Sequence, residues 1–534
     1  MRGRNFHANG PTGATAVTDK PEQVTLPEYK MVFIEGAMNI GALTLNEEKK
    51  LKSDRQSPFF FNMGKYSDGD STKALAKAYA QAIKTNFIDK GNDFDIIYGI
   101  PEKGVGFAVA VAAELSALGV NKGWCFSRKM PKDYGDATGK PTEFVGQTPK
   151  KGDRVLLLDD VIITGGTKDE AMGTMSKISG VKVIGLVIAL DRQEVGIDGQ
   201  STAKKFEETY SVPIVSIINA ADINTYLIGE LDQNPKVTKK IVSDFQSYMR
   251  AYGTDEAIKA IGIKIQAAIF EGKFGVIPAC DGLLPAWDPK NDDERLNWQK
   301  EGLDNFAALI EATASIDGIV GYKTGRELAD LGLIQIGFKT RHRTNKPLMH
   351  DDQKFGGDVP DTNLGNIRSK QAAGIVNMIN FPESGPETQR SAIYRALQRE
   401  EVLVGGGWMT HQAYEKPNGA FAEEYILNAY RIWARSGITT FVVPATKPDV
   451  VKKIVLAIEE EYTKLGYSDL QLSFVSPGIG AQGGDTKALK EAVGSRHSVF
   501  AIEGRAIITQ STPDASPDMT ERAKVAVEKL RKIM

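Results

Sequence analysis

Long apolar runs alternate with helical stretches along the N-terminal part of the chain. Residues 94–100 (FDIIYGI), 154–163 (RVLLLDDVII) and 182–190 (KVIGLVIAL) are rich in Val, Ile and Leu, and stretches such as 73–86 have the periodicity of a helix. Continuous apolar strands separated by helices are typical of a parallel sheet that helices cover on both faces. The pattern therefore predicts an α/β fold with a Rossmann-like parallel sheet for this region.

Eight shorter apolar runs follow in the C-terminal part of the chain. Helical segments such as 303–315 and 448–465 lie between most of them. Eight strand–helix units in about 280 residues match a closed (β/α)8 TIM barrel. In chain order the runs are 274–279, 317–322, 346–350, 373–379, 401–406, 438–444, 470–475 and 498–504.

A polar and charged stretch at 229–253 separates the two regions and predicts a linker helix. We expect the first domain to span 26–228 and the second to span 254–534. Residues 1–25 are polar, are rich in Gly, Thr and Pro, and lack the apolar core of a secretory signal. We therefore expect a flexible tail there.

The composition is that of an ordinary globular enzyme and narrows the possible partners. The chain has 534 residues, of which 41% are hydrophobic and 25% charged, and no apolar run approaches the length of a membrane span. Its 66 Lys and Arg nearly balance 68 Asp and Glu, so charge gives no reason to expect nucleic-acid or membrane binding. Two cysteines are too few for a disulfide framework, which favours a reduced, cytoplasmic protein.

The strongest local signal lies at 155–167, where an apolar strand ends in Asp159 and Asp160. Glycines after a strand let backbone N–H groups approach a phosphate, and the following helix N-terminus adds a favourable dipole. The two carboxylates can hold ribose hydroxyls, directly or through a divalent ion. The residues of the predicted phosphate-binding turn are Thr164, Gly165, Gly166 and Thr167.

This run resembles the 5-phosphoribosyl-1-diphosphate (PRPP) motif of type I phosphoribosyltransferases. Four other segments narrow the resemblance to orotate phosphoribosyltransferase. They are similar to the family's opening segment (51–62, LKSDRQSPFFFN), its second phosphate loop (99–106, GIPEKGVG), its flexible catalytic loop (125–136, CFSRKMPKDYGD) and its orotate-side arginine motif (189–194, ALDRQE).

The resemblance implies orotate and PRPP as substrates, with Mg²⁺ carried by PRPP and held only indirectly by Asp159 and Asp160. Departure of pyrophosphate develops negative charge that cations can neutralise, while the two carboxylates sit near the positive ribose. The chain departs from the family pattern at Tyr134, where the family usually has His. A neutral Tyr donates a proton less readily than His near pH 7, so we expect loop closure or the rate to differ. The cations are Lys103, Arg128, Lys129 and Lys132; the expected substrate contacts are Lys52, Arg192, Phe60 and Phe61.

Polar residues follow several of the eight C-terminal runs. They lie at the carboxyl ends of the predicted strands, which is where the active sites of barrel enzymes are found. The first run is followed by Asp281, the second by Lys323, and the third continues as 350–354 (HDDQK). A glycine-rich loop follows the seventh run and Arg505 follows the eighth, which is the usual phosphate grip of such barrels.

These terminators resemble the motif positions of orotidine 5′-monophosphate (OMP) decarboxylase. The spacing from Lys354 to Asp358 is one residue longer than the family's usual Asp-x-Lys-x-x-Asp. A period-two strand places Asp352 on the side of Lys354, whereas the Asp-His-Gln-Lys variant of the family selects Asp351, so both remain candidates. The matching residues are Asp281, Lys323, Asp351, Asp352, Lys354, Asp358, Thr362, Gly480, Gln482, Gly483 and Arg505.

By this resemblance, an aspartate crowds the departing carboxylate and Lys354 supplies the proton that replaces it. Alternating carboxylates and ammoniums hold one another charged, and the bound phosphate contributes remote binding energy. The family places Asp358 and Thr362 in the partner subunit's site, which implies a homodimer or higher homo-oligomer, and the decarboxylation needs no cofactor.

Because the first product is the second substrate, the chain resembles bifunctional UMP synthases, which convert orotate to OMP and then to UMP and CO₂. Two alternatives remain open: a PRPP-binding regulatory protein, and a transferase fused to a different sugar-phosphate barrel enzyme. Arg128, Lys129 and Lys132 argue against the first, while Gln482 and Arg505 favour OMP over the second.

Overall fold

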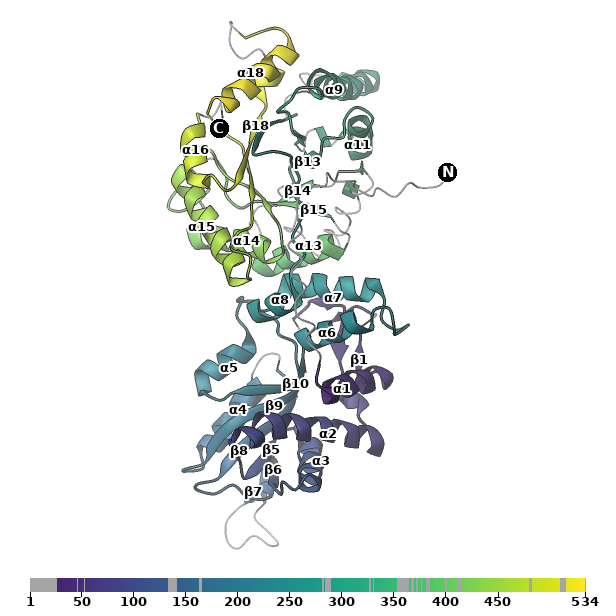
Figure 1. Ribbon diagram of the computed structural model, residues 1–534, viewed down its shortest axis with the longest axis vertical. Coiled ribbons are helices and arrows are strands. Elements are labelled where there is room, and N and C mark those ends of the chain that lie inside the picture. The colour runs from purple at the N-terminus through teal and green to yellow at the C-terminus, as the bar shows by residue number, and fades with distance from the viewer. Residues whose placement is uncertain are drawn as a thin grey trace.

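The computed structural model describes two α/β regions arranged end to end (Figure 1). The N-terminal region, with α1–α6, occupies one end and the C-terminal region, with α9–α18, the other, while α7 and α8 lie where the two meet. The described residues are 26–45, 47–51, 53–132, 142–162, 166–280, 283, 290–325, 328–329, 331–352, 365, 369–370, 373–375, 377–380, 385–398, 401–410, 414–479, 483–509 and 515–533.

The N-terminal region contains a six-stranded mixed sheet in the order β10-β9-β8-β5-β6-β7. All neighbouring strands are parallel except β6 and β7, so the predicted wholly parallel sheet is wrong at this edge. Two of the predicted apolar runs contain β5 and β8, and the third covers all of β9 except its last residue, Asp191. The strands are β5 (Ile96–Gly99), β6 (Gly123–Lys132), β7 (Thr142–Gly146), β8 (Arg154–Val161), β9 (Lys182–Asp191) and β10 (Ile214–Asn219).

Helices cover both faces of this sheet. In β8, Leu156 and Leu158 enter one apolar cluster, whereas Val155 and Leu157 enter another on the opposite face. This alternation follows from the two-residue period of a strand. Two short antiparallel pairs, β1 with β4 and β2 with β3, lie outside the sheet. Their bounds are β1 (Leu43–Thr44), β2 (Lys49–Lys50), β3 (Gln56–Ser57) and β4 (Phe60–Phe61).

Helix α2 shows how a sequence signal sets a helix boundary. It begins at Gly69, four residues before the predicted start, because Asp68 and Ser71 form a capping box at its N-terminus. The helices of this region are α1 (Glu28–Asn39), α2 (Gly69–Asn86), α3 (Gly104–Ala117), α4 (Gly166–Ser176), α5 (Thr202–Tyr210), α6 (Ala220–Glu230), α7 (Lys239–Tyr252) and α8 (Asp255–Ile261).

The C-terminal region contains eight parallel strands in the order β11-β18-β17-β16-β15-β14-β13-β12. Two isolated parallel bridges, Val276 with Ile319 and Ala279 with Lys323, link the segments that contain the end strands β11 and β12, so the neighbouring strands close into a ring. Each predicted run overlaps one strand, although β12 begins only at the last residue of run 317–322. The strands are β11 (Phe274–Pro278), β12 (Tyr322–Thr324), β13 (Leu348–His350), β14 (Asn377–Asn380), β15 (Val402–Gly405), β16 (Thr440–Val442), β17 (Ser473–Ser476) and β18 (Ser498–Glu503).

The buried apolar residues of this region fall into two main clusters. Ile277, Met349, Val404 and Phe500 form a small cluster, and the helices pack into a second, larger one that includes Trp433. The predicted helix 303–315 is the second half of α9, and 448–465 is α15. The helices are α9 (Asp292–Thr313), α11 (Leu333–Arg341), α13 (Pro386–Gln398), α14 (Glu423–Arg435), α15 (Pro448–Lys464), α16 (Thr486–Val493), α17 (Arg505–Ile508) and α18 (Met519–Arg531).

Helix α7 lies within the predicted linker but packs as part of the N-terminal core. Phe245 and Tyr248 are buried in the same cluster as Phe59. Tyr394 of α13, from the C-terminal region, joins this cluster and meets the Tyr248 ring edge-on at a centroid distance of 5.3 Å. The two regions are therefore joined through packed helices.

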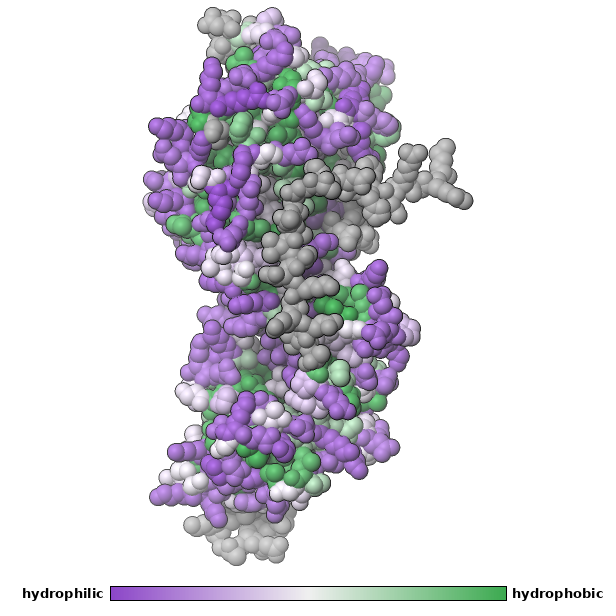
Figure 2. All heavy atoms as spheres, in the orientation of Figure 1, coloured by the Kyte–Doolittle hydropathy of each residue, from purple (hydrophilic) through white to green (hydrophobic). Residues whose placement is uncertain are grey.

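On the face that Figure 2 shows, hydrophilic residues predominate, and apolar residues gather in small patches on both regions. No helix in the described ranges has the length and hydropathy required to cross a lipid bilayer.

Candidate active sites

The carboxyl end of β8 brings two aspartates together with two lysines. Asp159 is buried, and its Oδ2 lies 2.6 Å from Nζ of Lys168 in α4. The same ammonium donates to the carbonyl of Val161 at 2.7 Å. Asp160 Oδ2 accepts from Lys103 Nζ at 2.7 Å. Lys168 was not singled out from the sequence, although it directly follows the predicted phosphate-binding turn.

Burial is the main influence on the ionisation of Asp159. Loss of water raises the pKa of this carboxyl, and the neighbouring Asp160 raises it further, while the Lys168 ammonium opposes both. The Tyr79 hydroxyl also donates to the Asp159 carbonyl at 2.7 Å, which ties the end of β8 to α2. Asp159 is therefore held through its backbone by α2 and through its carboxyl by α4.

The segment 99–106, expected to be a second phosphate loop, connects β5 to α3 through a close backbone approach. A Cβ added to Gly99 would lie 2.4 Å from the carbonyl oxygen of Gly104, and one added to Gly104 would lie 2.5 Å from that of Leu158. Only glycine fits at these two positions without a backbone shift. Lys103 precedes α3 and its side chain is exposed, so its ammonium is available at the edge where β8 ends.

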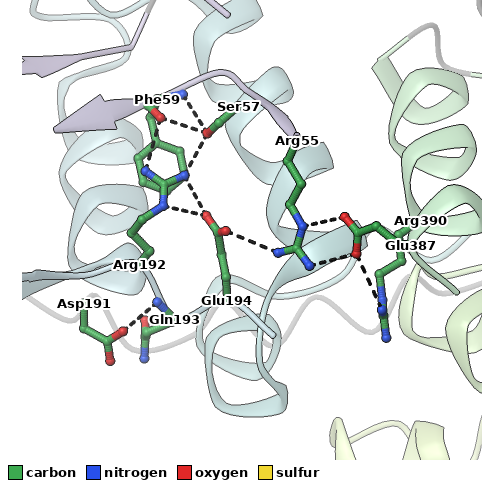
Figure 3. A network of polar contacts seen from close by, with 9 residues as sticks. All are labelled: Arg55, Ser57, Phe59, Asp191, Arg192, Gln193, Glu194, Glu387 and Arg390. Carbon is green, nitrogen blue, oxygen red and sulfur yellow. Dashed lines mark hydrogen bonds and ion pairs between the residues drawn. The ribbon is translucent and has the colours of Figure 1, made fainter. Parts of the chain in front are cut away.

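Arg192 is buried at the end of β9 in a network that Figure 3 shows. Its Nη2 donates to Ser57 Oγ at 2.8 Å, its Nη1 to the Phe59 carbonyl at 3.3 Å, and its Nε to Glu194 Oε1 at 2.8 Å. The guanidinium carbon lies 3.8 Å from the centroid of the Phe59 ring. The opening segment and the arginine motif, far apart in sequence, thus form one unit.

Phe60 and Phe61, both expected beside the orotate pocket, lie in different surroundings. Phe61 is buried in the N-terminal cluster, with its ring centroid 6.1 Å from that of Phe33. Phe60 is half-buried on the other side of β4, where it is paired with Thr44 of β1. Of the two rings, Phe60 is therefore the more accessible.

The predicted catalytic loop begins as part of a hairpin. β6 continues to Lys132, and Arg128 Nε donates across the hairpin to the Phe144 carbonyl of β7 at 3.2 Å. Gly166 and Thr167 are exposed at the start of α4. The expected site residues outside the described part of this region are Lys52, Tyr134, Thr164, Gly165 and the side chains of Lys129 and Lys132.

Two lysine–aspartate pairs lie at the carboxyl ends of β12 and β13. Lys323 is buried, and its Nζ lies 3.0 Å from Asp351 Oδ2. Lys370, which sequence reasoning did not identify, is also buried, and its Nζ lies 3.0 Å from Asp352 Oδ2. Because β13 ends at His350, the period-two argument that placed Asp352 on the side of Lys354 does not apply to Asp351 and Asp352, which lie beyond the strand.

His350 is buried beside these pairs as a neutral ring. Burial and the ammoniums of Lys370 and Lys323 lower the pKa of the imidazole, against the opposing charge of Asp352. Its Nδ1 and the Oδ1 of Asp351 are buried polar atoms without a hydrogen-bond partner in the described structure. Such atoms are uncommon in folded proteins and mark this end of the strands as a candidate ligand site.

The predicted phosphate grip is described only in part. Gly483 is exposed with φ of +75°, and Arg505 is exposed at the first residue of α17. The other expected residues of this region lie outside the described part of the chain, namely Asp281, Lys354, Asp358, Thr362, Gly480 and Gln482.

Comparison with known proteins identifies the family of the N-terminal region. The phosphoribosyl transferase domain model matches residues 66–214. An orotate phosphoribosyltransferase of Clostridium botulinum is 34% identical over 227 residues, which are 42% of this chain and 98% of that protein. The chain belongs, through its N-terminal region, to the orotate phosphoribosyltransferase family. A second relative, from Yarrowia lipolytica, is 36% identical over 218 residues, or 40% of this chain and 94% of that protein.

The orotate phosphoribosyltransferase region therefore has the type I phosphoribosyltransferase fold, built on the mixed sheet β5–β10. A crystal structure of the Francisella tularensis orotate phosphoribosyltransferase is 30% identical, covering 42% of this chain and 99% of that one, with a TM-score of 0.35. Residues 66–214 include β8, the start of α4 and Arg192. Arg55, Phe60 and the whole C-terminal region lie outside the matched residues.

The orotate phosphoribosyltransferase region offers few ligands for a metal ion. In the described residues, no group of three or more His, Cys, Asp or Glu side chains is arranged to hold one. Asp159 and Asp160 supply the oxygen ligands that Mg²⁺ prefers, but each contacts a lysine ammonium. The pair fits an ion that arrives bound to a substrate better than an ion held by the protein alone.

Proposed function

We propose that the N-terminal region transfers the phosphoribosyl group of PRPP to orotate, giving OMP and pyrophosphate. The observation that carries this proposal is the meeting of Asp159, Asp160, Lys103 and Lys168 at the end of β8, in a region that belongs to the orotate phosphoribosyltransferase family. Carboxylates suit the ribose hydroxyls and the developing positive charge on the sugar, while Lys103 suits the phosphate side.

The remaining residues take the roles that the resemblance implies. Lys129 and Lys132 neutralise the leaving pyrophosphate together with Arg128, and the turn at 164–167 binds the 5′-phosphate with its backbone N–H groups. Arg192 and Lys52 bind substrate, with Phe60 beside the orotate. Mg²⁺ comes with PRPP, where it neutralises the diphosphate charge.

We propose that the C-terminal region is a TIM barrel that decarboxylates OMP to UMP. This proposal is supported by the ring of eight parallel strands and by the buried pairs Lys323–Asp351 and Lys370–Asp352 at their carboxyl ends. Because Lys323 contacts Asp351, we assign Asp351 as the carboxylate that crowds the departing CO₂. Lys354 supplies the proton, and Arg505 with the loop 480–483 binds the phosphate.

The two activities would form a sequence within one chain, since OMP made by the first is consumed by the second. We place the division between the domains beyond α8, because α7 is buried in the N-terminal cluster. A homodimer in which Asp358 and Thr362 reach the partner subunit's site belongs to the same proposal.

Two single substitutions separate the proposed steps in an assay supplied with orotate, PRPP and Mg²⁺. Lys103→Ala removes a cation from the pyrophosphate side and should stop OMP formation. Lys354→Ala should leave orotate consumption intact but make OMP accumulate, since general acid catalysis alone contributes about 10²–10⁴-fold. Lys182→Ala, which changes an exposed lysine, is the control. UMP formation by Lys354→Ala within about tenfold of the parent rate would show that Lys354 is not the proton donor.

A further inference from the structure

An ion pair between a buried arginine and a half-buried glutamate joins the two regions directly. Arg55 lies in the opening segment of the N-terminal region, and its side chain is 4% exposed. Its Nε and Nη2 donate to the two carboxylate oxygens of Glu387 in α13, at 2.5 and 2.8 Å (Figure 3). Such two-pronged contacts fix direction as well as distance. Arg55 and Glu387 are 332 residues apart in sequence, so this contact depends wholly on how the regions pack.

The same arginine continues into the transferase region. Arg55 Nη1 lies 3.4 Å from Glu194 Oε2, and the other oxygen of Glu194 accepts from Arg192. The contacts therefore run without a break from Glu387 through Arg55 and Glu194 to Arg192, as Figure 3 shows.

Arg192 also contacts the opening segment, beyond Arg55 in the chain. Because its guanidinium contacts Ser57 and the Phe59 carbonyl, a movement of Arg192 would move the strand that leads to Phe60. Burial lowers the pKa of Arg55, but Glu387 and Glu194 outweigh burial and raise it, so the guanidinium stays charged and needs both carboxylates. Without Glu387, the Glu194 carboxylate is the remaining acid in contact with two buried arginines.

We propose that Glu387 of α13 is a positioning residue for the orotate side of the transferase site, acting through Arg55 and Glu194 on Arg192. This inference rests on the proposed transferase function. It assigns to the C-terminal region a part in the geometry of the first reaction, in addition to its own chemistry. Glu387 touches neither substrate; it sets where Arg192 and the segment 57–60 lie.

A second ion pair between the same two regions provides a matched control. Arg395, also in α13, places Nη1 2.5 Å from Glu48 Oε1 of the N-terminal region. Glu48 further accepts from Tyr394 and Gln398, and its described contacts include none with Arg55, Glu194 or Arg192. Removing either glutamate charge weakens the junction, but of the two only Glu387 is connected to Arg192 through described ion pairs.

The test compares Glu387→Gln with Glu48→Gln in the full chain, using initial rates of orotate-dependent pyrophosphate release. For Glu387→Gln we expect the KM for orotate to rise about three- to thirtyfold, the size of a coupling transmitted through intervening residues. The KM for PRPP and kcat should stay within about twofold of the parent values, because ground-state orotate binding is what changes. Glu48→Gln should leave all three parameters unchanged.

Two further variants separate positioning from a general loss of structure. Glu387→Asp keeps the charge on a shorter side chain, so its KM for orotate should lie between the parent and Glu387→Gln. Arg55→Lys should raise the KM for orotate, and adding Glu387→Gln to it should raise the KM little further, since both act on one chain of contacts.

The outcomes distinguish this inference from the function on which it rests. An active parent whose orotate KM is unchanged in Glu387→Gln, or is raised equally in Glu48→Gln, would overturn the positioning role and leave the transferase in place. A folded parent that releases no pyrophosphate from PRPP with orotate would overturn both.

Discussion

Buried carboxylates in this protein are held by specific lysines, and Asp159 with Lys168 is the clearest case. Both side chains are 7% exposed, and they meet at 2.6 Å. A buried ion pair adds little over an apolar pair, but breaking it leaves an uncompensated charge and costs about 3–5 kcal/mol. The contact therefore matters for how α4 is held against the end of β8, as well as for the proposed chemistry there.

Lys168→Met tests this dependence. Burial already raises the pKa of Asp159 above its usual value, so the folded state favours the protonated carboxyl. A carboxyl whose pKa is higher in the folded protein than in the unfolded chain stabilises the fold least at high pH. There the unfolded chain loses the carboxyl proton more readily than the folded protein does. The variant should therefore lose more thermal stability at pH 8 than at pH 5, with Lys177→Met, at an exposed position, as control.

A second substitution checks the cause. Asp159→Asn removes the buried charge, so the double variant Asp159→Asn/Lys168→Met should be more stable than Lys168→Met alone at pH 8. If the double variant melts at a lower temperature than the single one, the unpaired carboxylate is not the source of the loss.

Glu503, the last residue of β18, gives a second pH prediction. Burial raises the pKa of this carboxyl to about 7, against the weaker opposing effect of Lys529. Because the folded pKa is above that of the unfolded chain, the stabilising contribution is complete below about pH 4.5 and is lost as pH rises through about 7. The difference corresponds to about 3 kcal/mol.

Glu503→Gln keeps the neutral form at every pH. Its melting temperature should match the parent near pH 4.5 and exceed it near pH 8. The exposed Glu491→Gln should show no such change between the two conditions. A melting-temperature difference that is the same at both pH values would show that Glu503 does not titrate between them.

The sequence could indicate which side chains would meet where a short local motif contains them. Asp159, Asp160 and Lys103 were identified from short runs, because a strand end followed by a turn places its side chains at one edge of the sheet. Lys168 and Lys370 were missed, since a lysine on a helix is ordinarily a solvated surface charge. Only the three-dimensional structure shows that each meets an aspartate.

At the scale of elements, apolar runs located the strands well because burial on both faces leaves a continuous signal. All eight C-terminal runs overlap a strand. The hairpin β6–β7 was harder to predict, since its residues are mixed polar and apolar and lie at the sheet edge. The start of β12 was displaced because Ile319 forms only an isolated bridge.

Helix α7 is expected to stabilise the N-terminal region, although its polar sequence predicted a linker. Phe245 is 1% exposed and its ring centroid lies 5.0 Å from that of Phe59. Phe245→Ala should reduce the free energy of unfolding of this region by about 3–5 kcal/mol, since it leaves a cavity in the core. Denaturant unfolding measures the loss, and Lys239→Ala, at an exposed position of α7, should change it little. A loss below about 1 kcal/mol would mean that α7 is a detachable linker.

At the scale of the whole molecule, the junction between the regions could not be predicted from sequence. Arg55 lies in the opening segment 51–62, whereas Glu387 lies in none of the motifs found in the sequence, and no local pattern signals that they will meet. Tyr394 likewise reads as an ordinary helix residue, yet it is buried between Tyr248 and Tyr252 of the other region. Long-range contacts of this kind follow from how complete domains pack.

Metal removal should affect the two proposed reactions differently. Mg²⁺ accompanies the diphosphate of PRPP, whereas the pairs Lys323–Asp351 and Lys370–Asp352 supply their own charges. EDTA should therefore abolish OMP formation from orotate and PRPP but leave the conversion of supplied OMP to UMP unchanged. Equal loss of both rates would contradict the assignment of the metal to the first step alone.

The central claim is that one chain carries orotate through OMP to UMP. Its most direct test is the release of labelled CO₂ from carboxyl-labelled orotate by the purified full chain. We expect labelled CO₂ to appear with an equal amount of UMP, and only when PRPP and Mg²⁺ are both present. Accumulation of OMP with the label retained, and without CO₂, would contradict the decarboxylase half of the account.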